Sequence, residues 1–573
     1  MRKLLTALTA LTLVGGVSLG APAPAMAADH NYWISTASVG DGTSCASPTY
    51  EYDAADGSKN LNDLLDNILD EVAAEGYTSV MIAICDADDG EQQVYEMDQD
   101  TDPEVDVTGA EITIAGVQWD ATSEEDVADA GDVVIDGNED WSPFEFNNAD
   151  INIGYLTIED AFDDNTGAAI HFSQSFEEVV YELNLDHVVI DGAWIDGGYG
   201  AGVYAEGSVT ITDSTFTDNI AEDAYGGAVY VTDAVAVTIS DSVFGDPDND
   251  ADGNYADDSG GDIYVEGDAV VADLKISNSE FYDGESGGDG GSIAAVCAAA
   301  VLNGVTISGS EAGDNGGGLW ASDSEGCAED YAVTVSNSRF LSTLGGEQGG
   351  AISNDQDDAE SLTDMIVRGS YFYQNEAGSG AAFKLDGTNL TVSKSTFIEN
   401  HAGEYGGTIE LCNNEDVTIT GSRFERNTSE GAGGVIRQNC GLQTLRLVGN
   451  TFTQNETEDD GGVVYIDGFS DESTFTATSN KFIGNLAGDH GGVFGVYLNS
   501  SAKDSTFLRG LRRNTYRGNR ADSDRDGYGK GGILVIFYDD YDGRSPQRRL
   551  ESALRSGNTI QGARTGLVYQ GND

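Results

Sequence analysis

Alternating carboxylates are the residues in this sequence whose spacing most directly suggests chemistry. The pattern Asp-x-Asp-x-Asp-Gly occurs twice, as Asp248, Asp250, Asp252 and Gly253 and again as Asp522, Asp524, Asp526 and Gly527. Oxygens at alternate positions face one centre and the glycine lets the chain wrap, as in the first half of a calcium loop. The glutamate that would complete the loop is missing, because Ser259 and Ile533 occupy its position. Calcium loops and solvated acidic loops are therefore both open interpretations.

No residue pattern predicts catalysis. The 5 histidines show no metal-ligand spacing, and the sequence has no nucleophile elbow. Carboxylate pairs for glycoside hydrolysis cannot be singled out among 101 Asp and Glu residues. We assign no catalytic residue, and calcium is the one cofactor that the sequence indicates.

A repeated unit determines where these loops lie. An alternating β-branched run precedes Ser-x-Phe-x-x-Asn, a polar loop and a Gly-Gly pair, as at 390–409 and 417–436. The unit recurs roughly every 30 residues. The aromatic position holds Phe216, Phe244, Phe281, Ala312, Phe340, Phe372, Phe397, Phe424, Phe452, Phe482 and Tyr516. The glycine pairs begin at 226, 260, 290, 317, 349, 406, 433, 461, 491 and 531, with Gly380-Ala381 once.

Such a unit cannot bury its apolar face alone. Alternation and Gly/Asn/Asp clusters predict short strands and turns, and stacking the units gives a parallel β-solenoid. The phenylalanines would then stack in one ladder at roughly 4.8 Å per coil, and the asparagines would form a second ladder inside a turn.

The repeats also resemble a known family. The Gly-Gly-Ala-Val at 226–229, the Gly-Gly-Ala-Ile at 349–352 and their Phe-x-x-Asn partners look like the paired repeats of the polymorphic outer-membrane-protein (chlamydial-type) family. The resemblance covers 208–535. It implies an all-β, right-handed parallel β-helix of pectate-lyase-like architecture with roughly 12–15 coils. Chlamydial-type members end in an autotransporter barrel, which we do not expect in this sequence.

The wider architecture implies an alternative activity. Its relatives include polysaccharide lyases, which use calcium-bound carboxylates with an arginine or lysine base. Candidate bases on neighbouring coils are Arg368, Lys384 and Lys394, which are otherwise ordinary surface charges. The tryptophans of the early coils could stack on sugar rings or pack in the core, and they are Trp119, Trp141 and Trp194.

The chain divides into five segments. Residues 1–27 read as a signal peptide, cleaved between Ala27 and Ala28. Residues 28–107 predict a strand, an amphipathic helix and a strand, which form a small α/β cap over the first coil. The other segments are irregular early coils at 108–207, regular repeats at 208–535, and a last coil with a basic end at 536–573.

The cysteines fit the coil period. An exported protein with 6 cysteines is expected to form disulfides. Residues one coil apart stack within bridging distance if they share a face. The predicted pairs are Cys297–Cys327 and Cys412–Cys440, each one coil apart, and the remaining Cys45–Cys85 in the cap.

The charge restricts the partners. The net charge is −75, which argues against nucleic acid and indicates salty surroundings or divalent cations. Residues 501–573 hold 13 Lys and Arg against 9 Asp and Glu, a net +4, so residues 1–500 carry −79. The basic end is either a docking patch for an anionic wall polymer or a solvated cap. No later segment is long and apolar enough for a membrane helix.

Two functional hypotheses follow. The first is a secreted or surface-exposed, monomeric, non-enzymatic β-helix that mediates adhesion or another extracellular interaction with a glycan or surface protein, with calcium as a stabiliser. The second is a polysaccharide lyase or hydrolase that acts on an extracellular glycan from the same scaffold. Fold alone does not separate them.

Overall fold

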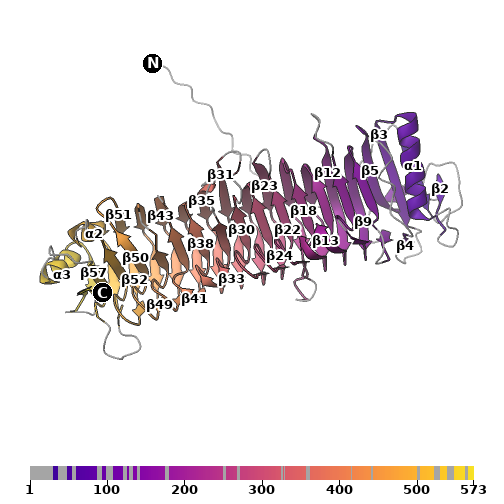
Figure 1. Cartoon of the computed structure of the whole chain (residues 1–573). Coiled ribbons are helices and arrows are strands. Elements are labelled where there is room, and N and C mark those ends of the chain that lie inside the picture. The colour runs from indigo at the N-terminus through magenta and orange to yellow at the C-terminus, as the bar shows by residue number, and fades with distance from the viewer. Residues whose placement is uncertain are drawn as a thin grey trace, which may run out of the picture.

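The computed structural model shows an elongated stack of coils with a helix at the amino-terminal end and two helices at the other (Figure 1). The structure describes residues 30–35, 45, 48–53, 60–86, 93–97, 108–120, 125–127, 133–138, 142–164, 166–174, 180–249, 253–267, 271–323, 327, 330–355, 362–414, 416–440, 443–499, 504–521, 530–538, 547–561 and 566–572. The predicted signal peptide and its cleavage site at Ala27 and Ala28 lie outside these residues.

Each coil contributes short strands to three parallel sheets. A representative coil contains β39 (Asn389–Ser393), β40 (Thr396–Ile398), β41 (His401–Tyr405) and β42 (Ile409–Cys412). Among the described residues the sheets have 32, 12 and 15 strands, and we call them the first, second and third sheets. β39 and β40 belong to the first, β41 to the second and β42 to the third. The result is an all-β, right-handed parallel β-solenoid of about 13 turns, which confirms the predicted fold class.

The third sheet forms one long face of the stack. Its other strands are β8 (Phe144–Asn147), β11 (Ile170–Ser173), β14 (Val203–Glu206), β18 (Val229–Thr232), β22 (Ile263–Glu266), β26 (Ile293–Val296), β30 (Leu319–Ser322), β34 (Ile352–Asp355), β38 (Phe383–Asp386), β46 (Ile436–Gln438), β50 (Val464–Phe469), β54 (Phe494–Leu498), β57 (Leu534–Tyr538) and β59 (Val568–Asn572). Side chains alternate along each strand, so every coil places one side into the core and the other on this face.

The predicted aromatic ladder runs through the interior. From Phe216 to Phe281 and from Phe340 to Tyr516, successive ring centroids lie 4.6–5.1 Å apart. The rings are buried to within 1% of their surface. Full burial of one such side chain stabilises the fold by about 1.5–3 kcal/mol.

One position of this ladder differs from the expectation. Ile307, not Ala312, fills the gap, because it pairs with Phe281 on one side and Phe340 on the other. Ala312 belongs to β29 (Glu311–Ala312) of the second sheet. An aliphatic side chain fills the ladder position as well as an aromatic ring does. A pattern that requires an aromatic residue therefore assigns the wrong residue to this coil.

The asparagine ladder also forms as predicted. Asn427 is fully buried, and its Nδ2 donates to Asn455 Oδ1 at 2.9 Å and to Phe397 O at 3.1 Å. Its Oδ1 accepts from the backbone N–H and the side-chain Nδ2 of Asn400, at 3.1 and 2.8 Å. Each asparagine therefore forms hydrogen bonds with backbone groups in the turn of the neighbouring coil, as buried polar groups require.

The glycine pairs allow two features of the turn before the third sheet. Gly226 has φ +70°, which other residues seldom adopt. A Cβ on Gly227 would lie 2.2 Å from Gly261 O of the next coil, so the second glycine permits close stacking.

The amino-terminal end has the predicted strand–helix–strand order. β1 (His30–Ser35) and β3 (Ser79–Asp86) pair in parallel, and β3 pairs with β5 (Glu111–Asp120), so these strands already belong to the first sheet. Between them α1 (Leu61–Glu75) begins at the N-cap Asn60 and buries its apolar face on this end of the core (Figure 1).

Two helices at the carboxyl-terminal end were not predicted. They are α2 (Asp504–Gly510) and α3 (Gln547–Arg555), and α3 buries Leu550 and Leu554. The expected last coil follows as β58 (Thr559–Gln561) and β59.

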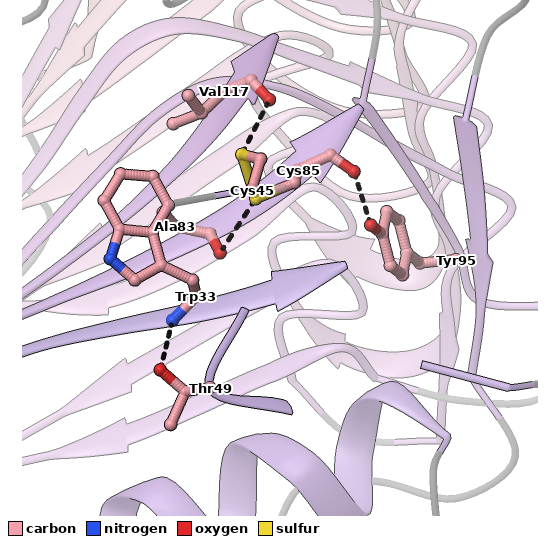
Figure 2. The surroundings of a disulfide bond; sticks show 7 residues. All are labelled: Trp33, Cys45, Thr49, Ala83, Cys85, Tyr95 and Val117. Carbon is pink, nitrogen blue, oxygen red and sulfur yellow. Dashed lines mark hydrogen bonds between the residues drawn. A yellow bond between two sulfur atoms is a disulfide. The ribbon is translucent and has the colours of Figure 1, made fainter. Parts of the chain in front are cut away.

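All three predicted disulfides form. The Cα atoms are 5.5 Å apart in Cys45–Cys85, 5.4 Å in Cys297–Cys327 and 4.7 Å in Cys412–Cys440. Figure 2 shows the first, where Tyr95 Oη donates to Cys85 O at 2.5 Å. The other two join neighbouring coils, as their one-coil spacing predicts.

Candidate functional site

A single column of side chains runs along the outer face of the third sheet. Strand pairing places Ser353, Lys384, Glu410, Arg437 and Tyr465 opposite one another in consecutive coils. The same column begins at Glu145 and His171, and between them and Ser353 it holds tyrosines and a tryptophan. These are Tyr204, Tyr230, Tyr264 and Trp320.

The charged part of the column lines a cleft of about 500 Å³. Lys384, Glu410 and Arg437 form its floor, and its wall comes from the second sheet, including Glu347 and Glu404. The wall exists because the second sheet is locally extended. Its strands there are β33 (Leu344–Gln348), β37 (Glu376–Ser379) and β41, whereas β29 before them and β45 (Thr428–Ser429) after them have two residues. Register shifts between β33, β37 and β41 accompany the extension.

Glu410 is held among polar partners at the bottom of this cleft. Lys384 Nζ lies 3.8 Å from Glu410 Oε1, and the two side chains are 15% and 5% exposed. Ser379 Oγ donates to Glu410 Oε2. A buried carboxylate requires such compensation. Lys384 and Glu410 therefore place an amino group and a carboxyl group side by side on the floor of the cleft.

The aromatic part of the column has its own wall. The second-sheet strands β13 (Trp194–Tyr199) and β17 (Ile220–Tyr225) are six residues long and flank it. Tyr199, which is 40% exposed, lies 4.6 Å from Tyr230 and 5.9 Å from Tyr225 between ring centroids. Tyr204 and Tyr230 stack at 5.8 Å with an interplanar angle of 6°.

The tyrosine hydroxyls are fixed by carboxylates. Tyr204 Oη donates to Glu206 Oε1 at 3.0 Å, and Tyr230 Oη donates to Glu266 Oε2 at 3.3 Å. Burial first, and then the nearby glutamate, raises the pKa of Tyr204 and of Tyr230. Both hydroxyls therefore remain protonated donors, and the rings are held in one orientation.

The three candidate lyase bases do not come together. Arg368 ends β35 (Leu362–Arg368), and Lys394 follows its partner Ser393 in the next coil, so these two lie together on the first sheet. Lys384 lies on the third sheet. The three residues lie on neighbouring coils, as the sequence indicates, but on two different faces, and of the three only Lys384 lines the cleft of the third sheet.

The other sequence candidates have different outcomes. Asp248 is exposed, and its backbone N–H donates to Asp246 Oδ1 at 2.8 Å. The remaining calcium candidates lie outside the described residues, and they are Asp250, Asp252, Asp522, Asp524 and Asp526. Trp194 is 38% exposed and packs against Phe162 at 5.0 Å. Trp141 and the side chain of Trp119 also lie outside the described part.

Sequence spacing missed two groups of possible metal ligands. Asp186, His187 and Asp213 form one, and Asp460, Asp489 and His490 form the other, each with ligand atoms within 4.8 Å of one another. Coil stacking assembles both groups, because each joins residues from consecutive coils. His490 Nδ1 lies 3.2 Å from Asp460 Oδ1.

The structure also bears on membrane insertion. No helix among the described residues is long and apolar enough to cross a membrane.

Comparison with solved structures finds similar chains, and two of them align over most of this chain. A mannuronic acid specific polysaccharide family 6 lyase from human gut microbiota shares 9% identity, with 94% of this chain and 92% of that chain covered and a TM-score of 0.27. The tailspike protein of E. coli bacteriophage HK620, solved with a hexasaccharide, shares 11% identity, with 89% and 74% covered and a TM-score of 0.28. Scores this low carry no argument about activity.

Comparison by sequence identifies the family. No curated protein matches the chain. The model of the right-handed β-helix region matches residues 199–352 and 304–486, which together span half of the sequence. This match does not extend to the narrower resemblance to polymorphic outer-membrane proteins. Periodicity, strand pairing and the family match agree that this chain belongs to the right-handed β-helix family.

Proposed function

We propose that this chain is an extracellular, non-enzymatic protein that binds a glycan along the outer face of its third sheet. One observation carries the proposal. Stacked tyrosines and a charged cleft lie on the same outward column, and each is flanked by a local extension of the second sheet.

The length of this face suits a polymer. Tyr204 and Arg437 are eight coils apart along the third sheet. At roughly 4.8 Å per coil, the column between them is about 38 Å long. A small molecule would occupy one part of it, whereas an extended chain can contact both the tyrosines and the cleft.

The side chains suit sugar residues. A pyranose ring offers an apolar face, which packs on an exposed aromatic ring such as that of Tyr199. It also carries hydroxyl groups, which both donate and accept hydrogen bonds. The exposed carboxylates Glu347 and Glu404 accept such bonds, whereas the Lys384 ammonium and the Arg437 guanidinium donate them.

The proposal of binding without turnover rests on where the three candidate bases lie and what they contact. A lyase needs a free base beside the proton that it removes. Lys384 is paired with Glu410, while Arg368 and Lys394 lie on another sheet. Three disulfides also support an oxidising, extracellular location.

The test is a glycan screen that reads binding and turnover together. The secreted chain is incubated with immobilised neutral glycans, pectins, alginates and glycosaminoglycans, with and without calcium. Retention on a glycan without release of unsaturated ends or reducing ends supports the proposal. Release of either product assigns an enzyme on the same scaffold, and no retention on any glycan overturns the proposal.

A further inference from the structure

The carboxyl-terminal end of the solenoid holds a second pocket, which is basic although the chain is acidic. Its volume is about 590 Å³. Four arginines line it, together with an apolar floor that includes Leu508, Leu511 and Leu550. The arginines are Arg509, Arg512, Arg513 and Arg549. They lie within the segment 501–573, which carries +4 in a chain of net charge −75.

Folding brings Arg549 to three arginines that are already close in sequence. Arg509 lies in the last turn of α2, and Arg512 ends β55 (Leu511–Arg512). Arg549 comes from α3, more than thirty residues later, where Leu550 and Leu554 anchor the helix in the core. The packing of α2 against α3 therefore places Arg549 across the pocket from the other three arginines.

Hydrogen bonds fix the base of the pocket. Arg513 N–H donates to Gly557 O at 2.7 Å, which joins the β55 turn to the end of α3. Asn558 Nδ2 donates to Leu511 O at 2.9 Å and to Leu554 O at 2.8 Å. Arg512 Nε donates to Arg509 O at 2.9 Å. The backbone segments that carry the arginines are thus hydrogen-bonded to one another at the base of the pocket.

The charges of this pocket are not neutralised within the described part of the chain. None of its four arginines forms an ion pair there, whereas Arg423, Arg426 and Lys275 each pair with a carboxylate. The carboxylate of α3 is directed elsewhere, because Glu551 Oε1 accepts from Leu567 N–H at 3.2 Å. In a chain with 101 acidic and 26 basic residues, unpaired arginines grouped around one pocket are unexpected.

We propose that this pocket binds the oxyanion groups of an anionic glycan. A guanidinium group donates two parallel hydrogen bonds to a sulfate, phosphate or carboxylate. Four such groups around one opening would hold one or two substituents of the polymer, while the leucines contact its carbon skeleton. The pocket lies at the end of the solenoid, so the inference does not depend on the third-sheet site.

Charge decides among possible occupants. A nucleic acid needs a long positive surface, whereas the remainder of this chain is strongly negative and would repel it. A glycan with few, widely spaced oxyanion groups needs only the pocket, because its neutral residues are not repelled by the acidic body. An acidic surface of a second copy is the competing occupant, and the experiment distinguishes it.

The test compares binding of sparsely substituted dextran sulfate and neutral dextran to the full secreted chain. The variant R512E/R549E reverses two pocket charges. R517E/R520E makes the same charge change on exposed arginines of this end that do not line the pocket. Melting temperatures of all three proteins establish that each is folded, and inorganic phosphate serves as a competitor.

The proposal expects binding of dextran sulfate but not of dextran, weakened by phosphate and by salt. R512E/R549E should lose about tenfold or more in affinity, whereas R517E/R520E should change by about twofold or less. An equal loss of affinity in both variants, or no binding of dextran sulfate by the wild type, would contradict the proposal that this pocket is the binding site. The competing occupant is tested by sedimentation at low salt. If the wild type forms an oligomer that R512E/R549E abolishes and R517E/R520E does not, the pocket binds a second copy of the chain, and the proposal of a glycan ligand is wrong. E285Q/E376Q, whose exposed carboxylates line neither this pocket nor the third-sheet cleft, should bind dextran sulfate like the wild type. The third-sheet site is tested separately, by the glycan screen.

Discussion

Replacing Asn427 by alanine should destabilise the solenoid far more than its small change in volume suggests. The side chain forms four hydrogen bonds with residues of two neighbouring coils, and it is fully buried. The substitution removes the acceptor of the Asn400 backbone N–H and one donor to Phe397 O. Each buried group left without a partner costs about 1–3 kcal/mol, so N427A should lose about 2–5 kcal/mol of unfolding free energy.

The assay is equilibrium unfolding in urea, followed by far-ultraviolet circular dichroism. Asn303 supplies the matched control, because its exposed side chain accepts one hydrogen bond, from Asn337 Nδ2 at 3.2 Å. N303A should lose less than about 0.5 kcal/mol. The reasoning is refuted if N427A stays within about 1 kcal/mol of the wild type, or if both variants lose the same amount.

Three further predictions concern stability. The double variant C412S/C440S opens a 28-residue loop and should lose about 3–4 kcal/mol in the same urea assay; an unchanged midpoint would show that the coils need no covalent link. Burial raises the pKa of Asp262 to about 8, so its contribution to stability is complete below about pH 4 and is lost as the pH rises through 8. Thermal melts across this range should show D262N gaining on the wild type as pH rises, and parallel curves would contradict this. If the two Asp-x-Asp-x-Asp-Gly loops hold calcium, ion at about 100 times its Kd should stabilise the fold by about 2.7 kcal/mol over a chelated sample, whereas identical melts would exclude such sites.

Most of the fold is visible in the sequence because the period is a physical requirement. Every coil must stack a large apolar side chain on that of the preceding coil, and it must satisfy the backbone hydrogen-bonding groups of the same turn. Phenylalanine, asparagine and glycine therefore recur in register. Two of the three cysteine pairs follow from that period, and Cys45–Cys85 follows as the remaining pair. Ile307 was missed because the ladder needs an apolar side chain rather than an aromatic one.

The candidate site was less predictable. Lys384 follows Gly380-Ala381, which places it on the third sheet, whereas Arg368 and Lys394 precede the Ser-x-Phe motif of their coils and lie on the first sheet. The position of Lys384 just after the glycine pair could therefore have shown that it lies on a different sheet from Arg368 and Lys394. The cleft depends on the extension of β33, β37 and β41, and their loop sequences have no fixed spacing that shows it.

The arginine pocket was hidden for a related reason. Leu550 and Leu554 have helical spacing, but this short segment lies among polar residues after the last clear repeat. Without α3, no sequence pattern brings Arg549 to Arg509 and Arg512. The basic end was recognised from its charge, and its shape required the structure.

Affinity for the glycan retained in the screen tests the central claim most directly. Dissociation constants would be measured for the wild type, for E347Q/E404Q in the cleft wall, and for E285Q/E376Q, which removes two exposed second-sheet carboxylates outside the cleft. The account predicts that E347Q/E404Q binds about tenfold more weakly while E285Q/E376Q matches the wild type. Equal affinity of all three proteins would contradict a glycan site on the third sheet.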